Sequence, residues 1–190
     1  MSRRAWAWSV PAAVLVLTAL GSFYAASTPR FALYRLSVAM QRHDVASAES
    51  YFDVERIADR ATEVIVADYL ARQPEPTTAA ESHGRQLVAT MAKRRVRPQV
   101  VTRVRFEIRR SVDRAGIQAT ALVLPVGAVA VFRAFEISSA GPDVWVTYLD
   151  AAQGPVRFRM SRQAGRGWQI SEFDAEWVRR RVQEEPARIR

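Results

Sequence analysis

The stretch "RFALYRLSVAMQRHDVASAESYFD", residues 30–53, decides how the folded part of this chain begins. Its apolar residues recur at helical spacing and cover a wide arc in the first half of the stretch. Asp44 and Asp53 each stand where a new helix can start, because an N-cap aspartate accepts hydrogen bonds from backbone N–H groups that the helix leaves free. Thr28 is placed to cap the first helix in the same way. The sequence therefore predicts three successive helices, the third from about residue 54 to 72.

The hydrophobic period changes after Pro98 from that of helices to that of strands. A fourth helix is predicted for about residues 81–96, because a residue that precedes proline disfavours the helical conformation. The strands predicted beyond it are TRVRFEIRR (102–110), GIQATALVLP (116–125), AVAVFRAFEIS (128–138), DVWVTYL (143–149), PVRFRMS (155–161) and GWQISEF (167–173). A short buried helix fits the third of these segments nearly as well. Helices followed by antiparallel strands predict an α+β fold, with three or four helices packed on one face of a curved antiparallel sheet.

A run without charged residues, Ala5 to Ala26, precedes this domain. It is long enough to cross a bilayer as a helix, and aromatic residues near both of its ends suit the two membrane interfaces. One alternative is a signal peptide cleaved after Ala26 or Ser27. Another, since Arg3 and Arg4 are paired, is a twin-arginine export signal. We expect an uncleaved single-pass anchor in the inner (cytoplasmic) membrane, with the domain outside the cytoplasm.

The chain divides into three expected parts. Residues 1–27 are the signal anchor and residues 28–177 the α+β domain, which is an ordinary size for one domain. Residues 178–190 are a charged C-terminal tail or a frayed helix.

Composition restricts the chemistry that the domain can perform. The chain has no cysteine, which excludes disulfides, thiolate-bound metals and thiol nucleophiles. The formal net charge is +9, nearly all of it from arginine, since Lys93 is the only lysine. An excess of positive charge suits anionic lipid headgroups, an acidic envelope protein or nucleic acid, and it also arises from an arginine-rich proteome. We expect no nucleic acid partner if the domain lies outside the cytoplasm, and the sequence leaves the oligomeric state open.

Arginines are the most distinctive polar residues of the predicted strands. Arg103, Arg105 and Arg109 are predicted on one face of one strand, and Arg157 and Arg159 on one face of another. If the two strands are neighbours, these guanidinium groups form a cluster that can hold phosphate or carboxylate groups. The alternative is a solvated sheet face on which acidic side chains balance the charge.

Other candidate site residues are few. His43 and His83 are the two histidines, and neither has nearby ligands for a metal site. No phosphate-binding or dinucleotide-binding motif is present, so no cofactor is expected. Tyr148 and Asp150 stand two residues apart on one predicted strand, as a donor and a base of a pocket enzyme could, although a surface tyrosine and a turn aspartate fit equally well.

The opening stretch resembles the start of a bacterial family known only as a domain of unknown function. The shared features are an N-terminal membrane segment, a Ser-Pro and Leu-Tyr-x-Leu helix, and an Ala, Asp and Tyr-x-Asp step. They match Pro29, Leu33, Tyr34, Leu36, Ala39, Asp44, Tyr51 and Asp53, while Thr28 replaces the usual serine and Arg30 an aromatic residue. The closing GWQISEF also resembles the end of that family.

A looser resemblance is to the cone-shaped fold of nuclear transport factor and ketosteroid isomerase. It implies a bent sheet around a pocket, with Thr28, Asp44 and Asp53 as structural caps rather than catalytic acids. We expect a membrane-anchored domain that binds or scaffolds an anionic ligand or partner at the cell envelope and does not catalyse a reaction. The alternative is a pocket enzyme of the ketosteroid isomerase kind.

Overall fold

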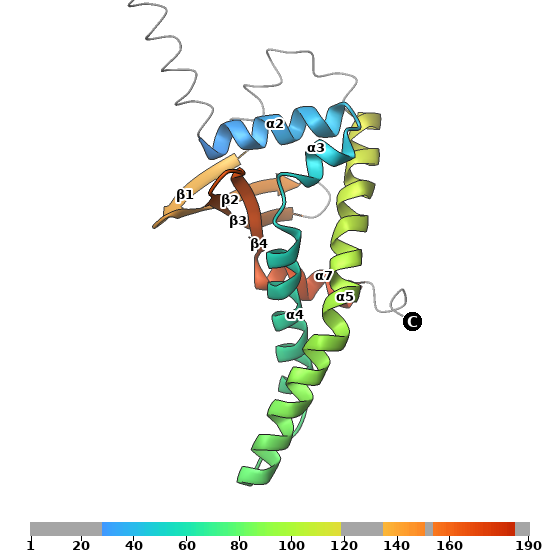
Figure 1. Ribbon diagram of the computed structural model, residues 1–190, viewed down its shortest axis with the longest axis vertical. Helices are drawn as coiled ribbons and strands as arrows, with labels where there is room; N and C mark the ends of the chain where they lie inside the picture. The colour runs from blue at the N-terminus through green and yellow to red at the C-terminus, as the bar shows by residue number, and fades with distance from the viewer. Residues whose placement is uncertain (1–27, 119–134, 151–153, 185–190) are drawn as a thin grey trace, which may run out of the picture.

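The structure is a computed structural model that describes residues 28–118, 135–150 and 154–184. The helices are α2 (Pro29–Gln41), α3 (Val45–Glu49), α4 (Val54–Ala71), α5 (Ala79–Gln118) and α7 (Ala175–Glu184), and the strands are β1 (Phe135–Ala140), β2 (Asp143–Asp150), β3 (Gly154–Gln163) and β4 (Gly167–Phe173). Figure 1 shows α2 across the sheet, while α4 and α5 run side by side and extend well beyond it. The α+β class predicted from the sequence is confirmed.

The four strands form one antiparallel sheet in the order β1-β2-β3-β4. The strands predicted for 143–149, 155–161 and 167–173 are confirmed as β2, β3 and β4. β1 begins at Phe135, within the segment predicted as a strand that a short buried helix fitted nearly as well. Most of that segment and of the strand predicted for 116–125 lies outside the described residues.

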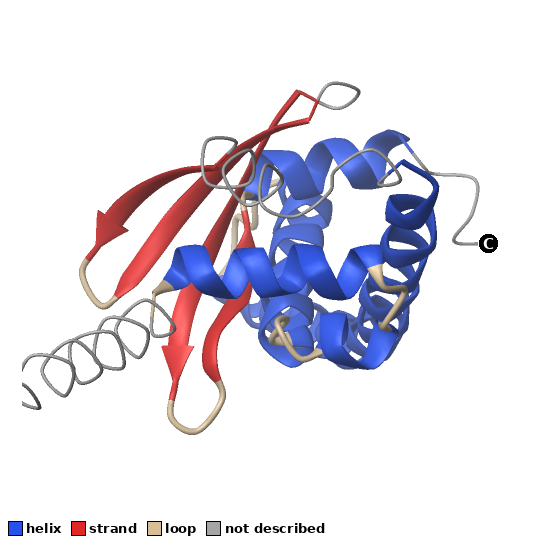
Figure 2. Cartoon of the chain, turned by 90° about the horizontal axis from the view of Figure 1, so that it is seen from above, coloured by secondary structure: helices blue, strands red, loops and turns tan. Residues whose placement is uncertain are grey.

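One face of the sheet packs on the helices and makes the core. Val146, Phe158 and Ile170 from three adjacent strands join Leu33 and Leu36 of α2 in one buried cluster. Seen from above, the strands lie to one side and most of the helices to the other, while α2 runs from over the strands toward the other helices (Figure 2). Burying these side chains removes apolar surface from water, which is the dominant favourable term in folding.

The chain turns sharply between α2 and α3, at His43. His43 has a positive φ of 54°, which is rare for a residue other than glycine. Its N–H donates to the Met40 carbonyl (3.2 Å), and the N–H of Asp44 donates to the Ala39 carbonyl (3.0 Å), which is the Schellman pattern at a helix C-terminus. Asp44 then caps α3 by accepting from the N–H of Ser47 at 3.0 Å. Hydrogen bonds from the hydroxyl and N–H of Ser47 lower the pKa of Asp44.

The other two predicted caps have the same geometry. The Thr28 hydroxyl accepts from the N–H of Phe31 at 3.3 Å, and an Asp53 carboxylate oxygen accepts from the N–H of Arg56 at 3.2 Å. The helices they begin, α2 and α4, start where the sequence predicted.

The step between α3 and α4 adds a short pairing to the edge strand β4. The N–H of Asp53 donates to the Ile170 carbonyl and the N–H of Ile170 donates to the Tyr51 carbonyl, both at 2.8 Å. The second carboxylate oxygen of Asp53 accepts from the Gln163 amide, and the Gln169 amide donates to the Ser50 carbonyl. The step therefore covers one edge of the sheet and fixes where α4 begins.

Helix α5 overturns two of the sequence predictions. It does not end before Pro98 but runs for 40 residues through it, about 60 Å, and the segment 102–110 is helical instead of a strand. Pro98 is exposed and has no N–H to donate to the Arg94 carbonyl one turn earlier. α5 changes direction along its length (Figure 1), as proline-containing helices do. We call α4, α5 and their connecting loop the helical arm (residues 54–118).

The C-terminal segment is more ordered than a tail. α7 continues to Glu184, and Trp177 stacks on Phe173 with ring centroids 5.0 Å apart. Val178 of this helix is buried, and α7 contacts α4. Residues 178–184, predicted as part of a charged tail, are therefore helical and packed on the domain.

The membrane anchor predicted for residues 5–26 lies outside the described residues. Among the residues that the structure does describe, no helix has the length and apolar character needed to cross a bilayer.

We predict that Asp53→Ala destabilises the domain by about 1–2 kcal/mol, because the α4 N-terminus loses its cap and the Gln163 amide loses its acceptor. Urea unfolding followed by circular dichroism measures the change. Asp53→Asn keeps a side-chain oxygen at the cap and is expected to cost less than Asp53→Ala. Equal unfolding midpoints for Asp53→Ala and the unmodified protein would contradict the assignment.

We predict that His43→Gly stabilises the domain by about 0.5–1 kcal/mol, since glycine removes the cost of a positive φ and only part of that gain is lost to its freer unfolded chain. Thermal unfolding measures this effect. His43→Ala is the control and is expected to give no gain, because alanine meets the same steric cost. A melting temperature lowered by His43→Gly would mean that the histidine side chain itself is needed.

Candidate functional site

The arginine cluster predicted on two neighbouring strands does not form as expected. Arg103, Arg105 and Arg109 lie on α5, where residues two apart point in nearly opposite directions. Arg103 pairs with Glu107 one turn later at 2.7 Å. Arg105 reaches across to Glu49 of α3 at 3.2 Å. The prediction that the three share one strand face is wrong, because the segment is a helix.

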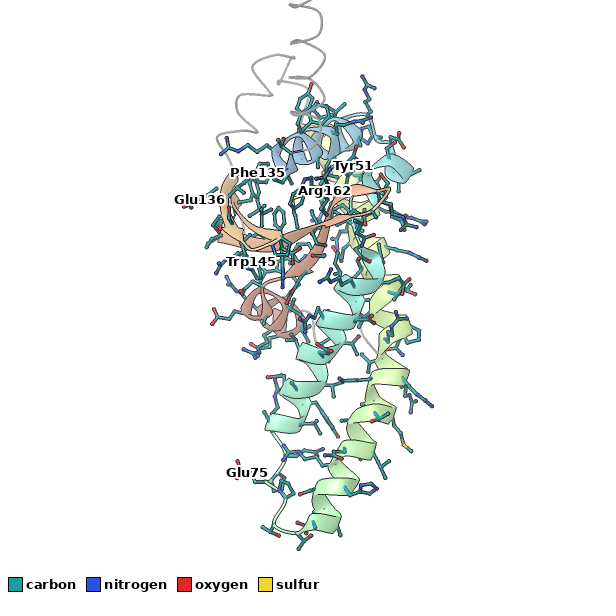
Figure 3. The ribbon with its side chains drawn as sticks, turned by 60° about the vertical axis from the view of Figure 1, so that its left-hand side comes forward. Tyr51, Glu75, Phe135, Glu136, Trp145 and Arg162 are labelled. Atoms are coloured by element: carbon teal, nitrogen blue, oxygen red, sulfur yellow. The ribbon has the colours of Figure 1, made fainter. Side chains whose placement is uncertain are left out.

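Arg157 and Arg159 do share a face of β3, as predicted. Arg159 forms an ion pair with Asp143 and lies 3.6 Å from Glu172. Asp143 is only 8% exposed, so Arg159 neutralises a carboxylate that is largely removed from water. The Arg157 guanidinium lies 4.7 Å from the centre of the Trp145 ring, in a cation–π contact. Figure 3 labels Trp145 on the side of the sheet opposite Phe135. Arg159 therefore contacts acidic side chains, and Arg157 contacts an aromatic ring.

Charges also join the two helices of the arm. Glu55, Asp59 and Glu63 stand one turn apart on α4. Arg97 of α5 bridges Glu55 (2.8 Å) and Asp59 (2.5 Å), and Lys93 lies 4.0 Å from Glu63. The hydrogen bond that Arg97 donates to the Asp59 carboxylate raises the pKa of Arg97 further above its usual value. Each exposed pair contributes little to stability, and together they link the facing sides of α4 and α5.

Four exposed arginines of α5 lie outside this network. Arg94, Arg95, Arg109 and Arg114 are exposed, and none of them forms an ion pair with another described residue. α2, α3 and α4 all contact α5. These arginines therefore leave uncompensated positive charge on the exposed surface of the helix.

The exposed side of α5 carries a regular stripe, which we call the outer stripe. Successive members are three or four residues apart, so they lie along one side of the helix. Its members, all exposed, are Val88, Met91, Arg95, Pro98, Thr102, Phe106, Arg109 and Asp113. Leu87 and Arg94 flank it.

The outer stripe contains large apolar side chains that are left in water. Met91 is 68% exposed, Phe106 50% and Val88 45%, and Leu87 beside them is 49% exposed. Among the described residues, the other large apolar side chain of this kind is Tyr69, on α4 of the same arm. Single exposed apolar residues such as Phe106 are ordinary, but neighbouring ones on one helix, as Leu87, Val88 and Met91 are, mark a candidate interaction site. The candidate functional site is therefore the outer stripe of α5.

The proposed enzyme residues are not brought into a comparable site. Tyr148 is half-buried, and its ring packs 5.3 Å from that of Phe135 as part of the core. The side chain of Asp150 lies outside what the structure describes. His43 terminates α2 and His83 is exposed near the start of α5. Within the described ranges, no group of three potential metal ligands occurs.

The sequence contains the helical spacing that produces the outer stripe, but the same segment also fits the period of a strand. Val104 and Ile108 alternate with arginines, which predicted a strand, yet Val101, Val104, Ile108 and Val112 also recur at helical spacing. Ile108 and Val112 are buried, which identifies this set as the packed side of α5. The outer stripe is the remaining side of the same helix.

Comparison of the chain with protein-family models, with curated proteins and with solved structures found no match. The fold and the site geometry are therefore the grounds for any assignment of function.

We predict that Arg159→Gln destabilises the domain by about 2–3 kcal/mol, because it leaves the carboxylate of Asp143 buried without a positive partner. Arg109→Gln removes the same charge from an exposed position and is expected to change stability by less than about 0.5 kcal/mol. Chemical unfolding of both variants tests the difference. Similar effects for the two variants would show that Arg159 is not a structural ion-pair partner.

Proposed function

We propose that this protein is a membrane-anchored binding or scaffolding protein whose domain holds an anionic partner at the outer side of the cytoplasmic membrane. The observation that carries the proposal is the outer stripe, where exposed arginines without an acidic partner among the described residues stand beside exposed apolar side chains. Guanidinium groups on a surface favour carboxylate and phosphate partners.

The sequence supports the location. The uncharged run from Ala5 to Ala26 is long enough to cross a bilayer, and the domain follows it directly. The resemblance to a family with an N-terminal membrane segment agrees with this reading. α2 begins at Pro29, so an anchor would hold the α2 end of the domain near the membrane.

The arm suits a role in binding. Figure 3 shows Glu75, in the loop between α4 and α5, far from the sheet residues Phe135 and Trp145. α5 therefore presents its outer side over a length that the body of the domain does not cover. A long helix held along one side by α4 gives a rigid surface, which lowers the ordering cost of binding.

The anion preference is tested with poly-L-glutamate as the probe and the full chain in nanodiscs of neutral lipid. The triple variant Arg94→Gln, Arg95→Gln and Arg109→Gln is expected to bind about tenfold more weakly, at roughly 0.5 kcal/mol for each exposed charge. The matched control removes three exposed arginines elsewhere, Arg35, Arg162 and Arg166. It is expected to lose little affinity. An equal loss in both variants would show that net charge alone governs binding, and absence of binding to the unmodified chain would refute the proposal.

The membrane location has a separate test. The full chain is expected to stay with membranes after alkaline carbonate washing, and protease added to spheroplasts is expected to degrade the domain. Release of a shortened chain into the soluble fraction would indicate a cleaved signal, and protection from protease would place the domain inside the cytoplasm.

A further inference from the structure

We infer that the outer stripe of α5 is the docking surface for one amphipathic α-helix of another protein, with acidic residues that face Arg95 and Arg109. The inference rests on the proposed function and names the class of partner that the site would take. It is carried by the spacing, the exposure and the charge of the stripe.

The spacing of the stripe is that of a helix–helix seam. From Val88 to Asp113 the members follow one another at intervals of three and four residues, the repeat by which one helix packs along another. The stripe is about 39 Å long, at 1.5 Å for each residue. α2, α3 and α4 contact α5, yet every member of the stripe stays exposed.

The stripe contains two kinds of residue: apolar side chains that can pack against a partner helix, and arginines that can fix the register of that helix. Val88 and Met91 form an apolar group on one side of Pro98, and Phe106 lies on the other side. Arg95 follows Met91 along the stripe, and Arg109 follows Phe106. The two arginines are two heptads, or about 21 Å, apart. Charged residues on a helix seam fix the register of the partner, because an unpaired buried charge is costly. The matching helix therefore needs apolar residues at seam positions and two carboxylates about two heptads apart.

A bilayer surface fits the stripe less well than a helix does. Helices that lie in a membrane interface have an unbroken apolar side, with the basic residues on the polar side. Here Arg95, Thr102 and Arg109 lie on the same line as the apolar residues and interrupt it. α5 also extends from the region of α2 to the far end of the arm (Figure 1). If the chain is anchored just before Pro29, that end points away from the anchoring membrane.

A second copy of this chain fits poorly because of charge. Two antiparallel stripes centred on Thr102 place Arg95 of one copy opposite Arg109 of the other, and two parallel stripes in register place each arginine opposite itself. Like charges at such positions oppose association. In an antiparallel copy in which Arg95 faces Asp113, Arg109 faces Gln99 and stays unpaired, so a partner that pairs both arginines is a different, acidic protein.

The test uses the full chain in neutral-lipid nanodiscs and three probes. Two of the probes are synthetic helical peptides of about four heptads, with leucine at the seam positions. At two seam positions, two heptads apart, one peptide carries glutamate and the other carries lysine. The third is vesicles rich in phosphatidylglycerol. We expect the glutamate peptide to bind at least about tenfold more tightly than the lysine peptide, and more tightly than its variant with the glutamates one heptad apart.

Charge reversal makes the test specific to the stripe. Arg95→Glu with Arg109→Glu is expected to reverse the preference in favour of the lysine peptide, whereas Arg35→Glu with Arg166→Glu, an equal charge change off the stripe, is expected to keep it. Met91→Ser with Phe106→Ser is expected to weaken both peptides, and Tyr69→Ser is the control for an exposed apolar residue off the stripe. All of these side chains are exposed, and circular dichroism checks that each variant is folded.

Three results would overturn the inference. They are equal binding of the two peptides, a preference that survives charge reversal on the stripe, and vesicle binding that depends on Arg95 and Arg109 while neither peptide binds. If poly-L-glutamate still binds in these cases, the proposed function stands and only the helical partner is refuted. If poly-L-glutamate fails as well, the proposed function fails with it.

Discussion

The pairing of the α3–α4 step with strand β4 is the constraint on which the rest of the structure depends. Two hydrogen bonds join Tyr51 and Asp53 to Ile170, residues more than a hundred positions apart in the sequence. They satisfy edge groups of β4 that would otherwise be free to pair with another chain. The same residues end one helix and cap the next, so the sheet edge and the start of α4 are fixed together.

The position of α4 in turn determines what α5 can present. α4 begins at the sheet, and its acidic residues Glu55 and Asp59 meet Arg97 of α5. Ile108 and Val112, further along α5, are buried against the body of the domain. These contacts fix the rotation of α5 about its own axis. The side that carries Met91, Arg95 and Phe106 is turned to solvent as a consequence.

The arginines of this chain therefore have two different structural roles. Some arginines neutralise carboxylates within the fold, as Arg159 does for Asp143 and Arg97 for Asp59. Others, such as Arg95 and Arg109, stand on the outer stripe beside exposed apolar side chains. Net charge alone does not separate these groups, because an arginine that is already paired with a carboxylate has little attraction left for an external anion.

The sequence by itself determined the elements whose signals are local. The caps at Thr28, Asp44 and Asp53 depend on side chains within one turn of the helix they begin, and the alternation in residues 143–149, 155–161 and 167–173 has no competing helical pattern. The α+β class follows from the order of these elements.

Only the tertiary structure decided the form of residues 98–118 and hence the candidate site. The segment 102–110 satisfies both the strand period and the helix period, and a local reading took Pro98 as the end of a helix. The helix forms because Val104 and Val112 pack in a core cluster supplied by elements distant in the sequence, and Ile108 is buried as well. Pro98 lies on the exposed side of the same helix. Which arginines are paired and which stay exposed depends on the same packing, and the sequence alone does not contain that geometry.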